Sequence, residues 1–296
     1  MEPIFDTGLA LRRKLRAAAA PVAGADFLAA QTASDLAERL STVGRDFPRA
    51  LLVHCRTDHA RRALQASGKA GEITTLEADP ALPGHAAGGM IASGEDLALE
   101  PGIHDLAVSL LSLHETNDTP GQLIQMRRTL KPDGLFVGAF PGSGTLAELR
   151  ESLLAAETEL TGGASPRVYP FADVRAAGAL LQRAGFALPV ADSETYTVRY
   201  DSMFALLRDL RAMGATSALA ARSRTPATRA LFARAADIYA ERFTDPDGRI
   251  RATFSIVWMS GWAPHESQQK PMKPGSARHS LSEALKASGG PADEVS

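Results

Sequence analysis

Short apolar runs alternate with amphipathic stretches through the first half of the chain, and this alternation predicts its secondary structure. The apolar runs predict strands at 50–53, 72–77, 89–92, 104–111 and 135–140. Amphipathic stretches between them predict helices at 60–67 and 119–130, the second with Pro120 at the favoured first helical position. Strands that alternate with helices in this way are typical of a parallel, doubly wound sheet.

The two ends of the chain follow a different, mostly helical pattern. Apolar residues recur at helical spacing before Pro48, so residues 1–47 are expected to form a helical extension. The second half is predicted to contain helices and two strands, at 145–161, 171–184, 190–198, 201–213, 226–243 and 251–260. We therefore expect a main domain at 48–263, with a helical insertion at about 200–245. Residues 264–296, with several prolines, are expected to form a flexible tail.

Composition narrows the class of protein. The 296 residues carry a formal net charge of -2, which offers no general attraction to nucleic acid or to anionic membrane. The basic cluster at 12–16 is interpreted as a solvated helix face. Cys55 is the single cysteine, which excludes an intrachain disulfide and a cysteine-based metal cluster. No apolar run reaches about 18 residues, so no membrane span is predicted. We expect a cytoplasmic protein, with peripheral association with a membrane left open.

Polar side chains follow the carboxyl ends of the predicted strands, which is where open α/β sheets bind their ligands. A carboxylate after the second strand can accept both hydroxyls of a ribose, and Asp79 is preferred there over Glu77. A solvated strand end or a helix cap explains either residue equally well. Glu95 and Asp96 follow the third strand and are candidates for contact with an adenine amino group.

Ser112, His114 and Glu115 follow the fourth strand. A neutral histidine at that position can orient a substrate or move a proton near neutral pH. The alternative is a structural histidine bonded to a backbone carbonyl. The chain has no nucleophile elbow and no phosphate-binding loop, which disfavours hydrolase and phosphoryl-transfer functions. His265 lacks the second histidine of a zinc motif, and no metal site is expected.

Several segments carry a family resemblance, namely 109–118, 130–136, 144–150, 162–167, 203–214 and 261–268. The first two resemble the BioC-like class I S-adenosylmethionine (SAM) methyltransferases. The others are similar to one branch of that family, the respiratory complex I assembly factors shared by mitochondria and alphaproteobacteria.

The resemblance implies an α/β fold with a Rossmann-like, seven-stranded, mostly parallel sheet and SAM as the cofactor. It also implies a protein substrate, such as a complex I subunit. From the net charge of -2, no nucleic acid partner is expected. Asp79 would contact the ribose of SAM, while Glu95 and Asp96 would contact the adenine. Ser112 joins these residues as a candidate for cofactor binding. His114 and Glu115 are the candidates for catalysis, beside the methyl donor.

Members of this family keep a glycine-rich turn after the first strand, whereas this chain has His54, Arg56 and Asp58 at the three glycine positions. These residues would form the cofactor turn. Glycine lets a backbone adopt positive φ and approach a ligand closely. Three side chains occupy space that the amino-acid part of SAM needs, although Arg56 can attract its carboxylate. Three functions stay open: SAM-dependent modification of a protein, a non-catalytic assembly factor that has lost SAM binding, and protein arginine hydroxylation on the same fold.

Overall fold

A seven-stranded sheet forms the centre of the fold, in a computed structural model that describes residues 2–269. Its strand order is β3-β2-β1-β4-β5-β7-β6. The strands are β1 (Phe47–Val53), β2 (Ala70–Glu77), β3 (Met90–Ile91), β4 (His104–Leu110), β5 (Leu130–Pro141), β6 (Ala187–Tyr200) and β7 (Ile250–Trp262). Strands β1 to β5 pair in parallel, whereas β7 runs antiparallel to both β5 and β6. The predicted mostly parallel, doubly wound sheet is therefore confirmed.

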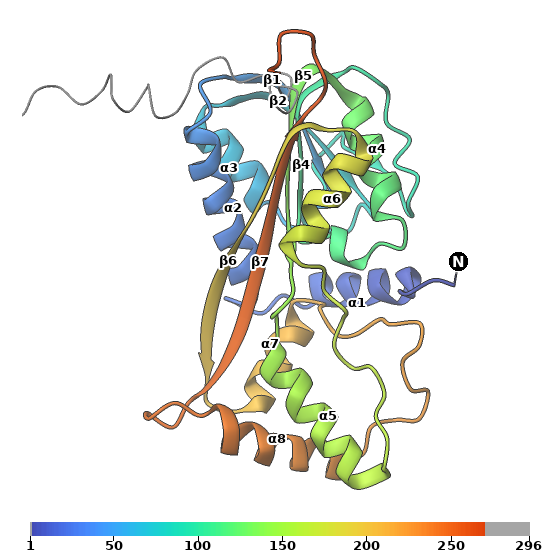
Figure 1. The fold of residues 1–296 in the computed structure, drawn as a ribbon, viewed down its shortest axis with the longest axis vertical. Helices are drawn as coiled ribbons and strands as arrows, with labels where there is room; N and C mark the ends of the chain where they lie inside the picture. Colours follow the sequence, from blue (N-terminus) through green and yellow to red (C-terminus); the bar gives the residue numbers. More distant parts are fainter. Residues whose placement is uncertain (1, 270–296) are drawn as a thin grey trace, which may run out of the picture. The chain divides into compact units, whose positions relative to one another are not determined.

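Helices cover both faces of the sheet (Figure 1). Helices α2 (Phe27–Ser41) and α3 (His59–Ser67) lie on one face, and α4 (Thr119–Thr129) and α6 (Val174–Ala184) lie on the other. Each face has its own apolar core, because the parallel strands are buried on both sides. Helix α4 begins where the sequence predicts, since Asp118 caps it by accepting from the Gly121 N–H at 2.8 Å.

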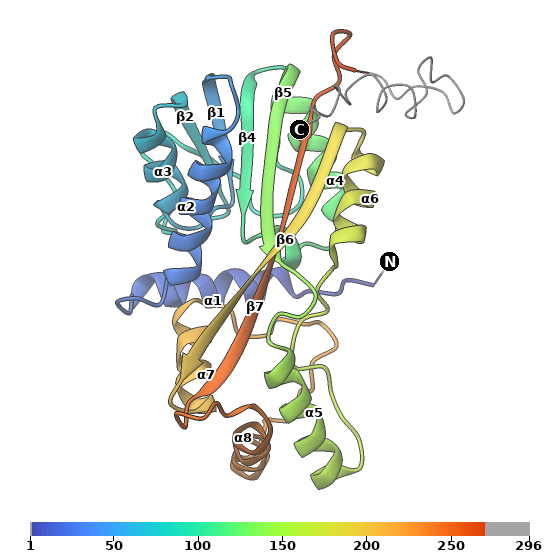
Figure 2. The same ribbon diagram turned by 60° about the vertical axis from the view of Figure 1, so that its left-hand side comes forward.

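Strands β6 and β7 are longer than their neighbours, and their far ends pack on helices (Figure 2). These helices are α5 (Ala147–Thr161), α7 (Met203–Ala212) and α8 (Arg229–Phe243). Helices α7 and α8 lie within the predicted insertion. Leu206, Ile238 and Tyr239 are almost fully buried and belong to the same apolar core as the buried residues of α2 and α3.

The N-terminal helix α1 (Thr7–Ala19) lies across the carboxyl ends of the central strands (Figures 1 and 2). Asp6 caps it by accepting from the Leu9 N–H at 2.9 Å. This placement brings a helix of the extension into the region where the sheet would bind a ligand.

Two details differ from the sequence prediction. The segment 131–134, which separates the predicted helix at 119–130 from the predicted strand at 135–140, lies within β5, where Asp133 has a positive φ of 63° and the pairing with β4 shifts register. The region 1–47 is not wholly helical, because β1 begins at Phe47. The tail predicted at 264–296 lies mostly outside the described residues. The domain boundaries stay predictions. No helix within residues 2–269 has the length and apolarity to span a bilayer.

Candidate ligand site at the strand ends

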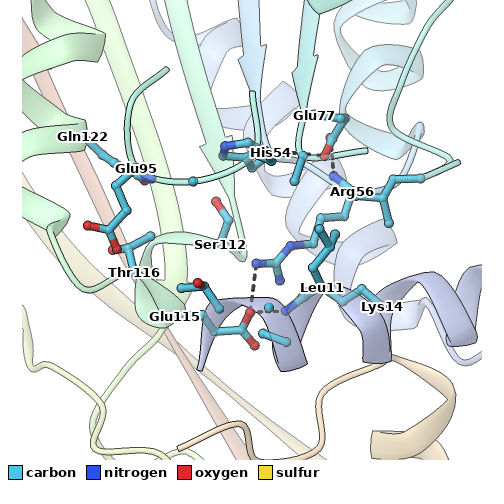
Figure 3. Close-up of a pocket in the computed structure, with 17 residues that line it drawn as sticks. Leu11, Lys14, His54, Arg56, Glu77, Glu95, Ser112, Glu115, Thr116 and Gln122 are labelled. Carbon is cyan, nitrogen blue, oxygen red and sulfur yellow. Dashed lines mark hydrogen bonds and ion pairs between the residues drawn. The ribbon is translucent and has the colours of Figure 1, made fainter. Parts of the chain in front are cut away.

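A cavity of about 260 Å³ lies between the carboxyl ends of β1, β2 and β4 and helix α1; we call it the strand-end cavity (Figure 3). In sheets of this type the crevice lies where the strand order reverses, here between β1 and β4. Of the residues predicted from sequence, six line it: His54, Arg56, Glu77, Glu95, Ser112 and Glu115.

The turn after β1 has positive φ angles of the kind that favour glycine, although it contains no glycine. His54 and Arg56 have φ angles of 51° and 62°, in the left-handed region that side chains rarely adopt. Asp58 has φ −85°, so the third position places no such demand on its residue. Such strain, about 1–3 kcal/mol per residue, persists only where surrounding contacts enforce it. The contacts here are backbone bonds, from the Arg56 N–H to Glu77 at 2.6 Å and from the Gly84 N–H to the Arg56 carbonyl at 3.0 Å.

Glu77, at the end of β2, faces the strand-end cavity, and Asp79 does not. Glu77 is only 1% exposed; one carboxylate oxygen accepts from the Arg56 N–H and the other, Oε2, has no hydrogen-bond partner among the described residues. Burial raises the pKa of Glu77 to about 7. Asp79 is half-buried, accepts from the Ala81 N–H at 2.8 Å and is absent from the cavity wall. Of the two candidate carboxylates after β2, the one that lines the cavity is therefore Glu77, the second choice from the sequence.

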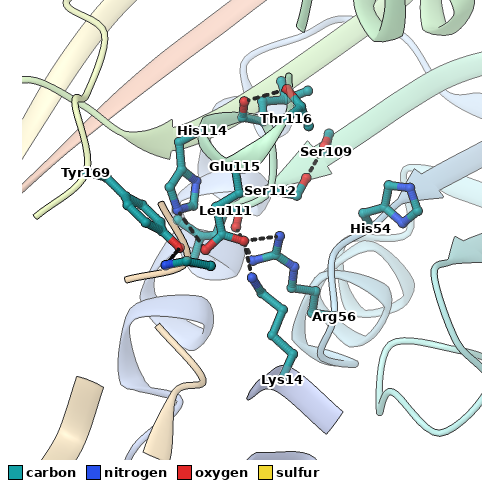
Figure 4. A network of polar contacts seen from close by, with 12 residues as sticks. Lys14, His54, Arg56, Ser109, Leu111, Ser112, His114, Glu115, Thr116 and Tyr169 are labelled. Atoms are coloured by element: carbon teal, nitrogen blue, oxygen red, sulfur yellow. Dashed lines mark hydrogen bonds and ion pairs between the residues drawn. The ribbon is translucent and has the colours of Figure 1, made fainter. Parts of the chain in front are cut away.

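A buried ion cluster closes the β4 side of the strand-end cavity (Figure 4). The Arg56 guanidinium donates to the Leu111 carbonyl at 2.8 Å and to Glu115 Oε2 at 2.9 Å. The Lys14 ammonium, from α1, donates to the same Glu115 oxygen. We call these three charged residues the Glu115 cluster.

Burial and charge set the protonation of the Glu115 cluster. Burial opposes ionisation of Glu115, but Lys14 and Arg56 outweigh it and hold the pKa of that carboxyl below its usual range. Burial, with the Arg56 charge, lowers the pKa of Lys14 to about 8 although Glu115 opposes the shift. The cluster contains two cations for one carboxylate, so it favours an additional anionic group over a cationic one.

His114 belongs to a second cavity of about 410 Å³, which we call the α1–α2 cavity because the chain between those helices lines it. Its ring lies 6.1 Å from that of Tyr169 and 6.0 Å from that of Phe171, between centroids. Its side chain is 10% exposed, and Nδ1 has no partner among the described residues. Burial lowers the pKa of His114 to about 3. His114 is therefore neutral at pH 7 and poorly suited to carry a proton there.

The remaining predicted residues have local partners. Ser112 bonds Ser109 at 2.8 Å between hydroxyl oxygens, and Glu95 accepts from the Asn117 N–H, both at the strand-end cavity. Asp96 is exposed and accepts from the Ala98 N–H at 3.1 Å, outside that cavity. Asp58 lines the α1–α2 cavity and pairs with Arg62 at 2.6 Å. The strand-end cavity is therefore not lined by four of the predicted residues, Asp58, Asp79, Asp96 and His114.

Sequence reasoning missed Lys14. It treated the basic cluster of α1 as solvated, whereas Lys14 is 8% exposed and reaches the ligand region. The available signal was its spacing: Lys14 lies four residues after Ala10, the other buried residue of this helix, and so shares its face. Among residues 2–269 no group of three or more His, Cys, Asp or Glu side chains is arranged to hold a metal ion.

The sheet order and the cavity at its strand ends define the class: this is a class I methyltransferase fold. Two solved structures share it, one of a Bacillus halodurans protein and one of the Bacillus subtilis protein YcgJ, both with a TM-score of 0.54. Their identities are 11% and 13%, over 78% and 79% of this chain and 99% of each of theirs. At these identities the likeness shows the fold alone. The chain matches no family model.

Sequence relatives identify the family. The chain is 39% identical to the mitochondrial arginine-hydroxylase NDUFAF5 of Mus musculus over 289 residues, which is 96% of this chain and 84% of that protein. It is 34% identical to the malonyl-acyl-carrier-protein O-methyltransferase of Xylella fastidiosa, over 54% of this chain and 52% of that protein. The chain belongs to the NDUFAF5 family. The mouse and human relatives are mitochondrial, which contradicts the cytoplasmic location expected from the sequence.

Proposed function

We propose that this chain is a methyltransferase-fold assembly factor of respiratory complex I that acts on an arginine side chain of a complex I subunit and binds a nucleoside ligand at its strand ends. Family membership supports the arginine client, because the relatives are named as arginine hydroxylases. The sequence resemblance to complex I assembly factors supports the role in assembly. The observation that carries the ligand site is Glu77, a buried carboxylate with an unpartnered oxygen beside the cavity.

The nucleoside part of SAM fits the residues that are present. A carboxylate at the end of the second strand accepts the two hydroxyls of a ribose, and Glu77 stands at that end with Oε2 available. An unsatisfied buried acceptor costs free energy, about 1–3 kcal/mol, which a ribose hydroxyl would recover. Glu77 would therefore hold the ribose.

The amino-acid part of SAM does not fit. Arg56 and Glu115 occupy the crevice between β1 and β4 through which that part would extend. We therefore derive no methyl-transfer step from this site. This closed end is also the specific observation that favours the second candidate function, an assembly factor that has lost methyl transfer and acts through its client surface alone.

Mass spectrometry of complex I separates these functions. In a strain that lacks this chain, we expect less assembled complex I, and the wild-type chain restores it. We also expect one subunit arginine to become modified only in the restored strain. A gain of one oxygen identifies hydroxylation, and a gain of one methylene identifies methylation.

Two variants control that experiment. Glu77→Gln should lose the modification, whereas Glu72→Gln on the same strand, whose carboxylate is exposed and outside the cavity, should retain it. Restored assembly with no change in any arginine mass would favour the non-catalytic factor. Equal assembly with and without the chain would refute the proposed function altogether.

A further inference from the structure

The Arg56 side chain spans the point where a ligand would cross the sheet. It starts from the turn after β1 and ends on the Leu111 carbonyl, just beyond β4, at 2.8 Å. In the sheet order, β1 and β4 are the neighbours between which the chain reverses its direction of winding. The guanidinium therefore lies in the crevice itself (Figure 4).

The crevice already contains charged groups of both signs that a free amino acid carries, with one cation in excess. An α-amino acid carries one ammonium and one carboxylate. Here the Arg56 guanidinium donates to a strand-end carbonyl, and the Glu115 carboxylate receives Arg56 and Lys14. The chain thus supplies both charged groups from its own side chains. A ligand with the same two groups has to displace them and leave a buried charge without its partner.

The other end of the strand-end cavity is open to a ligand. Glu77 Oε2 lacks a partner there, with His54 Nδ1 4.0 Å away. Burial lowers the pKa of His54 to about 4, so it stays neutral at pH 7 and leaves the carboxylate unneutralised. Lys14, Arg56 and Glu115 line both this cavity and the α1–α2 cavity, so the Glu115 cluster stands between the two spaces. A ligand that ends at the cluster fits the strand-end cavity, whereas a longer one would have to pass the cluster.

We infer that this cavity selects a 5′-substituted nucleoside that lacks an α-amino-acid group, over SAM and its demethylated product. Glu77 binds the ribose, and the Glu115 cluster closes the site beyond the 5′ position. This inference rests on the proposed nucleoside site and specifies its ligand class. It also assigns Arg56 and Glu115 as specificity residues that exclude the amino-acid part of the cofactor.

Two thioether ligands test the inference on the wild-type chain without any substitution. 5′-Methylthioadenosine and S-adenosylhomocysteine share the adenosine and the sulfur, and differ by the amino-acid part. Calorimetric titration should show that 5′-methylthioadenosine binds about tenfold more tightly than S-adenosylhomocysteine. Equal binding of the two ligands, or tighter binding of S-adenosylhomocysteine, would overturn the inference while leaving the nucleoside site standing. Absence of binding by both ligands would overturn the inference and the nucleoside site together.

A double variant tests the closing role of the cluster. Arg56→Gly with Glu115→Gln removes the internal pair and leaves Lys14 available for a ligand carboxylate. Its affinity for S-adenosylhomocysteine should rise about tenfold, while that for 5′-methylthioadenosine changes less than about threefold. The matched control is Arg49→Gly with Glu72→Gln, which removes an exposed pair of the same residue types on β1 and β2 and should change neither affinity. A folded double variant with unchanged S-adenosylhomocysteine affinity would overturn the inference, and the wild-type comparison decides it if the variant does not fold.

Discussion

The two ends of the strand-end cavity differ in how their charges are satisfied. At the β2 end, Glu77 is buried with one oxygen unpartnered and a pKa raised to about 7 by burial. At the β4 end, Glu115 is equally buried but receives two cations, which hold the pKa of that carboxyl low. One carboxylate is therefore poised to receive a ligand, and the other is already fully engaged by the protein.

Arg56 links the two ends and explains their difference. Its backbone N–H holds Glu77 at 2.6 Å, while its side chain reaches 2.9 Å from Glu115. Arg56 therefore contacts the Glu77 carboxylate through its backbone and fills the space toward Glu115 with its side chain. A turn without glycine can thus keep a backbone contact to a strand-end carboxylate while its side chains close the neighbouring space.

The largest expected effect is on stability, at the closed end. Glu115→Ala leaves the buried Lys14 and the half-buried Arg56 without their carboxylate, which should lower the unfolding free energy by about 3–5 kcal/mol. Urea denaturation measures it. The control Glu72→Ala removes the partner of Arg49 in an exposed pair and should have a much smaller effect. Equal losses in the two variants would show that the Glu115 cluster is not a buried structural unit.

The next effect concerns the open end. Glu77→Gln replaces the carboxylate that would receive the ribose, and charged hydrogen bonds of this kind contribute about 1.5–3 kcal/mol. The affinity for 5′-methylthioadenosine should fall about tenfold to a hundredfold by calorimetry. Asp79→Asn should change it little, because Asp79 lies outside the cavity. The reverse ranking of the two variants would return the ribose contact to Asp79.

A third expected effect is on the pH dependence of stability, to which His54 and His114 contribute with one sign and Glu77 with the other. The pKa values of His54 and His114 are lowered to about 4 and 3 by burial, so between pH 5 and 6.5 the unfolded chain binds protons that the native chain does not. Stability then falls as pH falls, by about 1.4 kcal/mol per pH unit for each fully titrating group. Glu77, with its raised pKa, acts in the opposite sense over this range, since only the native chain holds its proton.

His104, whose pKa burial also lowers, adds to the slope with the same sign as the other two histidines. His114→Gln should therefore reduce the measured slope near pH 5 by about the contribution of one group. Denaturation curves at several pH values between 5 and 6.5 measure it. His265→Gln, which replaces an exposed histidine, should leave the slope as in the wild type. A slope unaffected by His114→Gln would mean that His114 is not held neutral by burial.

The smallest expected effect is on ligand binding as a function of pH. Because Glu77 has a pKa of about 7, its ionised fraction rises about tenfold between pH 6 and pH 8. The affinity for 5′-methylthioadenosine should rise by up to that factor, since only the carboxylate accepts from both ribose hydroxyls. Glu77→Gln should bind with little pH dependence. A wild-type affinity that is constant over this range would separate ligand binding from the ionisation of Glu77.

Most of the fold could be predicted from the sequence, because apolar runs buried on both faces of a parallel sheet are strong local signals. The site was predicted only in part. Its strand-end location and the importance of His54 and Arg56 follow from the turn after β1. The choice between Glu77 and Asp79 depends on where β2 ends, and strand boundaries are weakly encoded. The spacing of Lys14 from Ala10 indicates a shared helix face, but the position of Lys14 at the cavity depends on how α1 packs against distant strands.

The most direct test of the proposed nucleoside site in the strand-end cavity is a crystal structure of the chain with 5′-methylthioadenosine. We expect the ribose hydroxyls on the Glu77 carboxylate, with Arg56 still bonded to the Leu111 carbonyl and to Glu115. A ligand bound elsewhere, or one bound in the cavity with the contact between Arg56 and Glu115 broken, would contradict it.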